Sequence, residues 1–228
     1  MKINLLLSGT LLSLSLFAQN TVNMADSSNT KTVTDVDGNT YKTLKIGGQV
    51  WMTENLRTSK YADGTSITNV TDNNQWKALS TAAWCHYDND SSQHEVTDGK
   101  LYNGYAVVTG KLCPTDWHIP TSAEWTVLTD YLVADGHSGA EGKALKSTSG
   151  WGSGGNGTDD YGWLGLPGGW RENDSGNFDY IGENGVWWSS SKSSANEAWS
   201  YALNIDSHDV YKESSNLEYG YSVRCLRD

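Results

Sequence analysis

A tryptophan-rich stretch in the second half of the chain carries the side chains best suited to hold a ligand. Flat aromatic rings stack on the C–H faces of sugars, while amide, carboxylate and guanidinium groups hydrogen-bond to hydroxyls. These residue types together predict a ligand-binding surface, formed by Trp170, Arg171, Asn173, Asp174, Trp187 and Trp188. Core packing is the alternative role for the tryptophans. Neighbouring residues of a strand point to opposite faces, so at least one of Trp187 and Trp188 is expected to be buried.

Histidine and aspartate alternate near residue 90 and suggest a metal site. His86 and Asp88 would share one face of a strand and His94 follows closely, which would offer nitrogen and oxygen ligands to a metal ion. A polar turn that contains histidines is the alternative. Asp159 and Asp160, in a glycine-rich loop, suggest either a loop calcium or solvated turn residues. No other cofactor is predicted.

The common catalytic motifs are absent or lack their structural context. Residues 150–155 have the glycine spacing of a dinucleotide-binding loop. They follow a predicted helix instead of a strand, so the turn that would cradle a pyrophosphate is missing. No Gly-x-Ser-x-Gly motif occurs in the sequence. The sequence therefore assigns no catalytic residue.

Three cysteines allow one disulfide and leave one thiol, or permit pairing between chains. A bond between Cys113 and Cys225 would tie the middle of the chain to its last strand, and we favour this pairing. The rival pairing joins Cys85 to Cys225.

The elements that must position these residues are mostly short strands around a helical centre. Glycine-containing turns at 37–38 and 47–48 predict hairpins from strands at 32–36, 40–46 and 49–52. Capping boxes at 121–124 and 138–141 predict two helices, which end near Gly136 and Ser147. A long glycine-rich loop follows. Further strands are expected at 100–108, 163–166, 177–181, 186–190, 199–205, 210–212 and 219–226. The pattern indicates an α+β domain.

The N-terminal segment reads as a targeting signal. Lys2 precedes an apolar run of about a dozen residues, too short to span a bilayer. The sequence therefore predicts a secretory signal peptide at 1–19, a flexible leader at 20–32 and one domain at 33–228. We expect no membrane insertion after the signal is cleaved.

The net charge of the chain bears on whether it binds nucleic acid. The chain holds 16 basic and 27 acidic residues, which gives a formal net charge of -11. Nucleic acids require a basic footprint, so a nucleic-acid partner is not expected. The 11 tryptophans, 12 tyrosines and 24 glycines indicate a turn-rich, aromatic fold.

Several segments resemble, in the same order, the Fibrobacter succinogenes major paralogous domain, which is found in exported proteins of Bacteroidetes and Fibrobacteres. The resemblance covers about residues 33–228. The segments that carry it are Val36–Asn39, Gln49–Leu56, Gly99–Asn103, Leu112–Thr121 with Glu124 and Trp125, Leu166–Gly169, Val186–Ser190 and Ser222–Arg227.

The resemblance implies a C-type-lectin-like fold, a twisted and mostly antiparallel sheet with two helices, long Gly/Trp-rich loops and neighbouring termini. The calcium and sugar motifs of calcium-dependent lectins are absent, and Cys225 lacks the neighbouring thiol of the sulfatase-modifying enzymes. Trp51, Trp117 and Trp125 lie within the family-like segments and are expected in the core. The resemblance supplies a scaffold but no settled activity.

Export, a lectin-like scaffold and aromatic loops together predict a non-catalytic binding or adhesion module for a glycan or a surface protein. The expected location is secreted, periplasmic or at the outer surface of a Gram-negative bacterium. A structural subunit of a cell-surface assembly is the first alternative. A metal-dependent enzyme that uses His86, Asp88 and His94 is the second.

Overall fold

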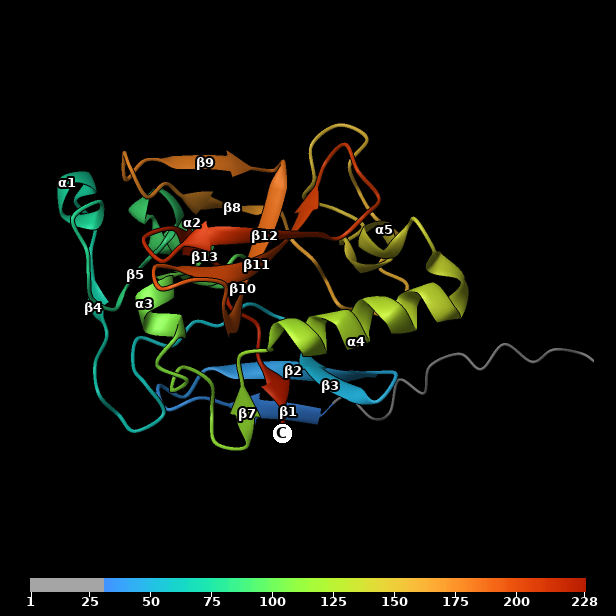
Figure 1. The fold of residues 1–228 in the computed structure, drawn as a ribbon, viewed down its shortest axis with the longest axis horizontal. Helices are drawn as coiled ribbons and strands as arrows, with labels where there is room; N and C mark the ends of the chain where they lie inside the picture. The colour runs from blue at the N-terminus through green and yellow to red at the C-terminus, as the bar shows by residue number, and fades with distance from the viewer. Residues whose placement is uncertain (1–30) are drawn as a thin grey trace, which may run out of the picture.

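The computed structural model describes residues 31–228, and Figure 1 shows their arrangement. The predicted signal peptide and all but two residues of the leader lie outside the described residues. Strand β1 begins at Lys31, two residues before the expected start of the domain at residue 33.

A five-stranded sheet gathers strands from both ends of the described chain. Its order is β1-β2-β3-β14-β7, and each neighbouring pair is antiparallel. The strands are β1 (Lys31–Thr34), β2 (Thr40–Ile46), β3 (Gln49–Met52), β7 (Trp117–His118) and β14 (Leu226–Arg227). Gly38 and Gly47 hold φ of 87° and 55° in the first two turns, as the hairpin signals predicted.

A nine-stranded sheet forms the rest of the β-structure, in the order β12-β11-β10-β8-β13-β6-β5-β4 with β9 paired to β8. The β10–β8 and β4–β5 pairs are parallel and the other pairs are antiparallel. The strands are β4 (Thr68–Asn69), β5 (Ala83–Cys85), β6 (Leu101–Asn103), β8 (Gly168–Arg171), β9 (Phe178–Ile181), β10 (Asn184–Lys192), β11 (Glu197–Asn204), β12 (Tyr211–Asn216) and β13 (Gly220–Tyr221).

Helix α4 (Ser122–Leu132) begins at the predicted capping box. The Thr121 hydroxyl accepts from the Glu124 amide, and the Glu124 carboxylate accepts from the Thr121 amide. Its apolar face buries Trp125, Leu128 and Leu132. The helix continues as a wide turn at Val133–His137 and ends where Gly136 takes φ 99°.

The second predicted capping box does not form. Helix α5 (Glu141–Leu145) is capped at Ala140 without a side-chain bond, and the Glu141 carboxylate accepts from the Gly139 amide instead. The strand expected at 100–108 is also shorter, because the Asn103 side chain accepts from the Ala106 amide and starts helix α3 (Gly104–Val107). The remaining α-helices of residues 31–228 are α1 (Asn73–Trp76) and α2 (Ser91–His94), and Tyr87–Asn89 forms a 3₁₀ turn.

Tryptophans fill the core between helix α4 and the two sheets. Trp51 of β3, Trp125 of α4 and Trp187 of β10 belong to one buried cluster, together with Trp163 from the glycine-rich loop. Trp51 and Trp125 are therefore core residues, as expected, whereas Trp117 is only partly buried. The segment 163–166, expected as a strand, makes only an isolated bridge between Gly165 and Lys146.

The α+β prediction is confirmed, since the described residues combine mostly antiparallel sheet with five short α-helices. Two sheets replace the single sheet that was expected. A long loop free of named strands and helices, 146–167, carries many of the glycines. Within residues 31–228, no helix is both long and apolar enough to cross a membrane.

Candidate functional site

The disulfide joins Cys113 to Cys225 across 112 residues of sequence, with 5.9 Å between their Cα atoms. The favoured pairing is confirmed and the rival pairing through Cys85 is wrong. Cys85 is a free thiol inside the core, and burial raises its pKa to about 12. A thiol with so high a pKa stays protonated at neutral pH and is a poor nucleophile.

Trp187 and Trp188 do not reach the surface, which corrects the prediction that they contact a ligand. Their exposed fractions are 1% and 0%. The Trp187 indole donates to Asn55 Oδ1 at 2.8 Å, and the Trp188 indole donates to the Tyr102 carbonyl at 2.7 Å. Strand β10 has a core cluster on each face, so both neighbours are buried although they point in opposite directions.

Arg171 is also a structural residue and not a ligand contact. Its guanidinium is fully buried and donates to the carbonyls of Gly176, Val70 and Thr71 and to Asn73 Oδ1. It lies over the ring of Trp76, 4.5 Å from the ring centre. All its donors are turned inward, so the predicted interaction with a bound sugar is wrong.

The proposed metal ligands do not converge. His86 Nε2 contacts the Glu95 carboxylate, and His94 Nδ1 lies 2.7 Å from Asp98 Oδ2. Asp88 lies in a 3₁₀ turn with φ 49°, so it does not share a strand face with His86. Among residues 31–228, no group of three histidine, cysteine or acidic side chains could hold a metal ion. The metal-site prediction is therefore corrected to two histidine–carboxylate pairs.

The two loop aspartates close turns of their own loop. Asp159 Oδ1 accepts from the Leu164 amide at 2.8 Å, and Asp160 Oδ2 accepts from the Thr158 hydroxyl at 2.8 Å. Their carboxylates therefore serve as turn acceptors, the alternative to a calcium site.

Trp170 is the one predicted aromatic that opens onto a hollow. It is half-buried on β8 and contributes to a groove of about 220 Å³ on the nine-stranded sheet. We call this hollow the aromatic groove, and it is lined by Trp170, Asn184, Val186, Ala202, Asn204, Tyr211, Glu213, Tyr219 and Tyr221. An adjoining hollow of about 300 Å³ shares Asn204, Tyr211 and Glu213 and extends the surface.

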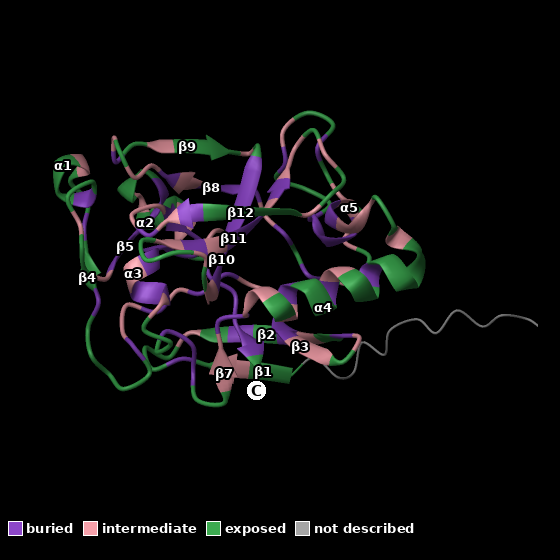
Figure 2. Cartoon of the chain, viewed as in Figure 1, coloured by how far each residue is buried: buried purple, intermediate pink, exposed green. Residues whose placement is uncertain are grey.

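The strand registers explain why these side chains meet. Val186 of β10 pairs with Ala202 of β11, which pairs with Tyr211 of β12, and Asn184 pairs with Asn204. These residues therefore share the sheet face opposite Trp187 and the α4 core. In Figure 2, β10 is mostly buried, whereas β9 and β12 are largely exposed. Small and apolar side chains on the inner strands thus form a floor, and the outer strands supply the walls.

Aromatic rings form two stacked pairs at the groove. Trp170 stacks on Tyr180 of β9, 4.4 Å apart with 23° between the ring planes. Tyr219 stacks on Tyr221 at 5.2 Å and 13°, and Tyr221 rests on the buried Trp188 at 4.7 Å. Each ring thus fixes the orientation of its neighbour, and the groove wall is connected to the core.

Tyr180 adopts an unusual backbone conformation at the edge of this site. Its φ is 62°, in the left-handed region that side-chain-bearing residues seldom occupy, and its exposed fraction is 48%. The β8–β9 register places it opposite Gly169, whose φ is 61°. Tyr180 therefore has a strained backbone and stacks on Trp170 beside the groove.

Polar groups at the groove are acidic or neutral. Asn204 Nδ2 donates to Asn184 Oδ1 at 2.7 Å, and the Trp170 indole donates to Glu172 Oε1 at 2.7 Å. Burial raises the pKa of Tyr219, and the nearby carboxylates of Glu172 and Asp174 raise it further. Neither the aromatic groove nor its extension is lined by lysine, arginine or histidine. The groove therefore favours neutral or cationic ligands over anions.

Sequence reasoning found Trp170 and Asp174 near this site but missed its tyrosines. Asp174 is exposed and Asn173 half-buried in the turn after β8, and neither lines the groove. Tyr219 and Tyr221 alternate, a spacing that places both on one face of an extended chain. The alternation is the signal that could have identified them, whereas Tyr180 and Tyr211 carry no local signal.

The chain matches the model of a known protein family. The family model described as the Fibrobacter succinogenes major domain matches residues 44–227, from β2 to β14. Searches of the curated proteins and of the solved structures gave no significant match. Because the family model matches well over half of the chain, this protein belongs to the Fibrobacter succinogenes major domain family.

Proposed function

We propose that this protein is an exported, non-catalytic binding module whose aromatic groove holds a sugar chain. The observation that carries the proposal is the groove itself, where half-buried Trp170 and exposed Tyr211 flank the amides of Asn184 and Asn204. Stacking surfaces beside amide donors and acceptors match the alternating C–H faces and hydroxyls of a saccharide.

We further propose that the sugar is neutral or bears an amino group. Glu213 and Asp206 line the groove and its extension, and Glu172 and Asp174 lie beside Tyr219. A uronic acid or sulfated sugar would place its negative charge against these carboxylates, which costs affinity.

The proposal includes a C-type-lectin-like fold and export of the protein from the cytoplasm. A C-type-lectin-like fold is supported by the first and last described strands, which share the five-stranded sheet, and by the long 146–167 loop. Export is supported by the N-terminal sequence and by the Cys113–Cys225 disulfide, since such bonds persist in oxidising compartments.

A glycan array followed by calorimetry tests the proposal. We expect the folded protein to bind neutral or amino-bearing oligosaccharides in preference to uronate-rich ones. Trp170→Ala and Tyr211→Ala should each weaken binding about tenfold, or about 1.4 kcal/mol. Tyr131→Ala, a change to a surface tyrosine of α4 outside the groove, should leave affinity unchanged.

A blank array with correctly folded protein would overturn the sugar proposal. Equal binding by wild type and both groove variants would overturn its assignment to the groove. If a pull-down then captured a surface protein only when Tyr211 is intact, the groove would be a protein-binding site instead.

A further inference from the structure

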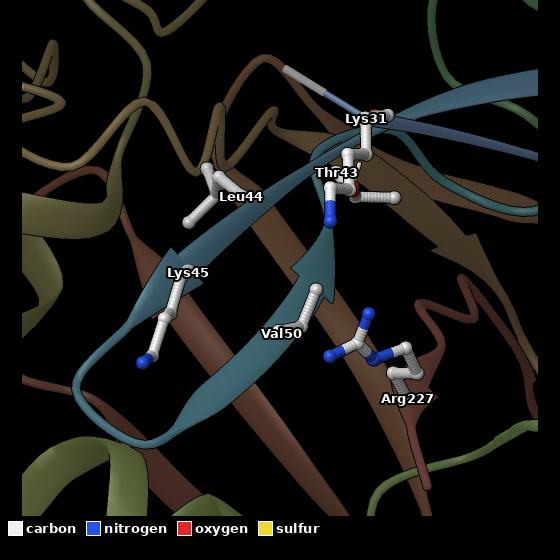
Figure 3. A pocket seen from close by; sticks show the side chains of 6 residues that line it. All are labelled: Lys31, Thr43, Leu44, Lys45, Val50 and Arg227. Carbon is white, nitrogen blue, oxygen red and sulfur yellow. Dashed lines mark hydrogen bonds between the residues drawn. The ribbon is translucent and has the colours of Figure 1, made fainter. Parts of the chain in front are cut away.

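A second hollow lies on the five-stranded sheet, away from the aromatic groove. Its volume is about 150 Å³, and it is bounded by strands β1, β2, β3 and β14. Figure 3 shows its lining side chains, which are Lys31, Thr43, Leu44, Lys45, Val50 and Arg227. We call this the basic hollow, because three of the six residues are cationic.

The sheet register brings the three cations to one face. Lys31 of β1 lies opposite Thr43 of β2, and Lys45, two residues further along β2, lies opposite Val50 of β3. Leu226 of β14 pairs with Trp51 of β3 in antiparallel register. Arg227 therefore lies beside Val50, on the side of β3 away from β2. Residues two apart or directly paired share a face, so Lys31, Lys45 and Arg227 lie on the face that carries Val50. In Figure 3 the Lys31 and Arg227 side chains turn toward Val50, whereas the Lys45 ammonium points outward.

None of these three cations has a carboxylate partner, a property that they share with most other lysines and arginines of residues 31–228, but here three of them are clustered. Lys60, Lys100 and Lys111 each form an ion pair with an acidic side chain. Within residues 31–228, neither the two lysines nor the arginine of the basic hollow forms one. The acids outnumber the bases by 27 to 16 in the whole chain, so a cluster of three bases without acids is a local reversal of its charge.

The rest of the lining defines what the hollow could accept. The Thr43 hydroxyl already donates to the Lys31 carbonyl at 2.9 Å, and Val50 offers only methyl groups. The charged donors of the lining are therefore two ammonium groups and one guanidinium, and no lining residue is acidic. The hollow has a volume of about 150 Å³ and is open to solvent. A small anion with part of its hydration shell fits this space.

We propose that the basic hollow binds a tetrahedral oxyanion, phosphate or sulfate, either free or carried on a larger molecule. The planar fork of Arg227 suits two oxygens of such a group, while Lys31 and, after rotation of its exposed side chain, Lys45 act as point charges on the others. An anion there would also relieve the mutual repulsion of the three cations. This site is independent of the aromatic groove, whose acidic lining favours the opposite charge.

Nuclear magnetic resonance titration of the mature chain tests the site with inorganic phosphate and sulfate as probes. At low ionic strength, about 0.01 M, charges act over about 30 Å. We expect saturable shifts of the backbone amide signals of β1, β2, β3 and β14, with a Kd on the order of 1 mM. The shifts should vanish in about 1 M NaCl, where the screening length is about 3 Å.

Two triple variants of equal charge separate a specific site from general attraction. The variant with Lys31→Gln, Lys45→Gln and Arg227→Gln should bind at least tenfold more weakly. The matched control, with Lys77→Gln, Lys111→Gln and Lys192→Gln, should bind like wild type. All six positions are exposed, so thermal melting should show that both variants fold.

Shifts scattered over the whole surface, or equal losses in the two triple variants, would overturn the proposal. If localised binding is seen, sulfated dextran and a phosphorylated oligosaccharide are compared with the free ions. Tighter binding of a polymer that still depends on Arg227 would identify a carried group as the ligand. Equal binding would identify the free ion.

Discussion

At the scale of single residues, two buried guanidiniums are stabilised by the same kinds of partner. Arg171 uses four hydrogen bonds and two aromatic rings, Trp76 and Phe178. Arg224 donates to Asn55 Oδ1 and lies 4.0 Å from the centre of the Trp163 ring, and burial lowers its pKa to about 9. A pKa of about 9 still leaves Arg224 charged at neutral pH. Both cations replace water by carbonyls and π faces instead of carboxylates.

Arg171→Lys should destabilise the fold strongly, although it preserves the charge. A single ammonium cannot reach carbonyls on both the 70–73 segment and the 176 turn, so buried acceptors would lose their partners. We expect the free energy of unfolding to fall by about 3 kcal/mol or more, measured by urea denaturation.

Arg57→Lys provides the matched control for this prediction. Arg57 is only half-buried, donates one bond to the Thr40 carbonyl and lies over Tyr41. Its replacement should cost less than about 1 kcal/mol. Equal losses in the two variants would show that Arg171 is not the anchor of the β8 turn.

At the scale of elements, α4 depends on its N-terminal box. Thr121 and Glu124 satisfy each other's amides, and His118 Nε2 adds a contact of 2.9 Å to Glu124. Thr121→Ala removes one cap acceptor and should lower the free energy of unfolding by about 1 kcal/mol. Thermal or urea denaturation measures this loss. Thr126→Ala, which removes only an exposed hydroxyl on the same helix, should change it by no more than about 0.5 kcal/mol.

The same box should depend on pH. Burial alone would raise the pKa of Glu124, but hydrogen bonds from Thr121 and His118 outweigh it, and the pKa lies below its usual value. The carboxylate therefore adds stability above the unfolded glutamate pKa of about 4.3, and this stability is lost as the pH falls through the lower folded pKa. The difference between wild type and Glu124→Gln should shrink in that acid range. A constant difference at every pH would contradict the assignment.

Strand β10 shows how an element can override the alternation expected of a strand. Its residues Asn184–Ser189 are all buried, because the sheet lies between the α4 core on one face and the cluster around Trp188 on the other. The face of β10 that carries Trp188 is less covered at the start of the strand. There Asn184 and Val186 line the aromatic groove. The position of the groove thus depends on where the second core ends.

At the scale of the whole molecule, the disulfide joins two distant parts of the chain. Cys113 precedes β7, and Cys225 immediately precedes β14 in the same sheet. Replacing both by alanine frees a loop of 112 residues in the unfolded state and should lower the free energy of unfolding by about 2–5 kcal/mol. Cys85→Ala, which leaves the bond intact, is the control and should cost about 1 kcal/mol. Equal effects measured by denaturation would show that the crosslink contributes little.

The charge of the molecule is also organised at this scale. The acidic aromatic groove lies on the nine-stranded sheet and the basic hollow on the five-stranded sheet. The net charge of -11 therefore hides two surfaces of opposite preference. Salt should weaken the binding of an oxyanion at the basic hollow far more than the binding of a neutral sugar at the groove.

Local patterns in the sequence determined the features that depend on neighbouring residues. The Thr121–Glu124 box, the glycine hairpins and the α+β class were predicted because caps and tight turns are set within a few residues. The favoured Cys113–Cys225 pairing and the family resemblance were also correct.

Tertiary structure decided which side chains are available for chemistry. Arg171, Trp187 and Trp188 have the residue types of a sugar site, yet long-range packing turns them inward, and His86 and His94 each meet a carboxylate instead of a metal. The aromatic groove and the basic hollow each join strands that are far apart in the chain. Burial and convergence are properties of strand order and register, which only the folded sheets establish.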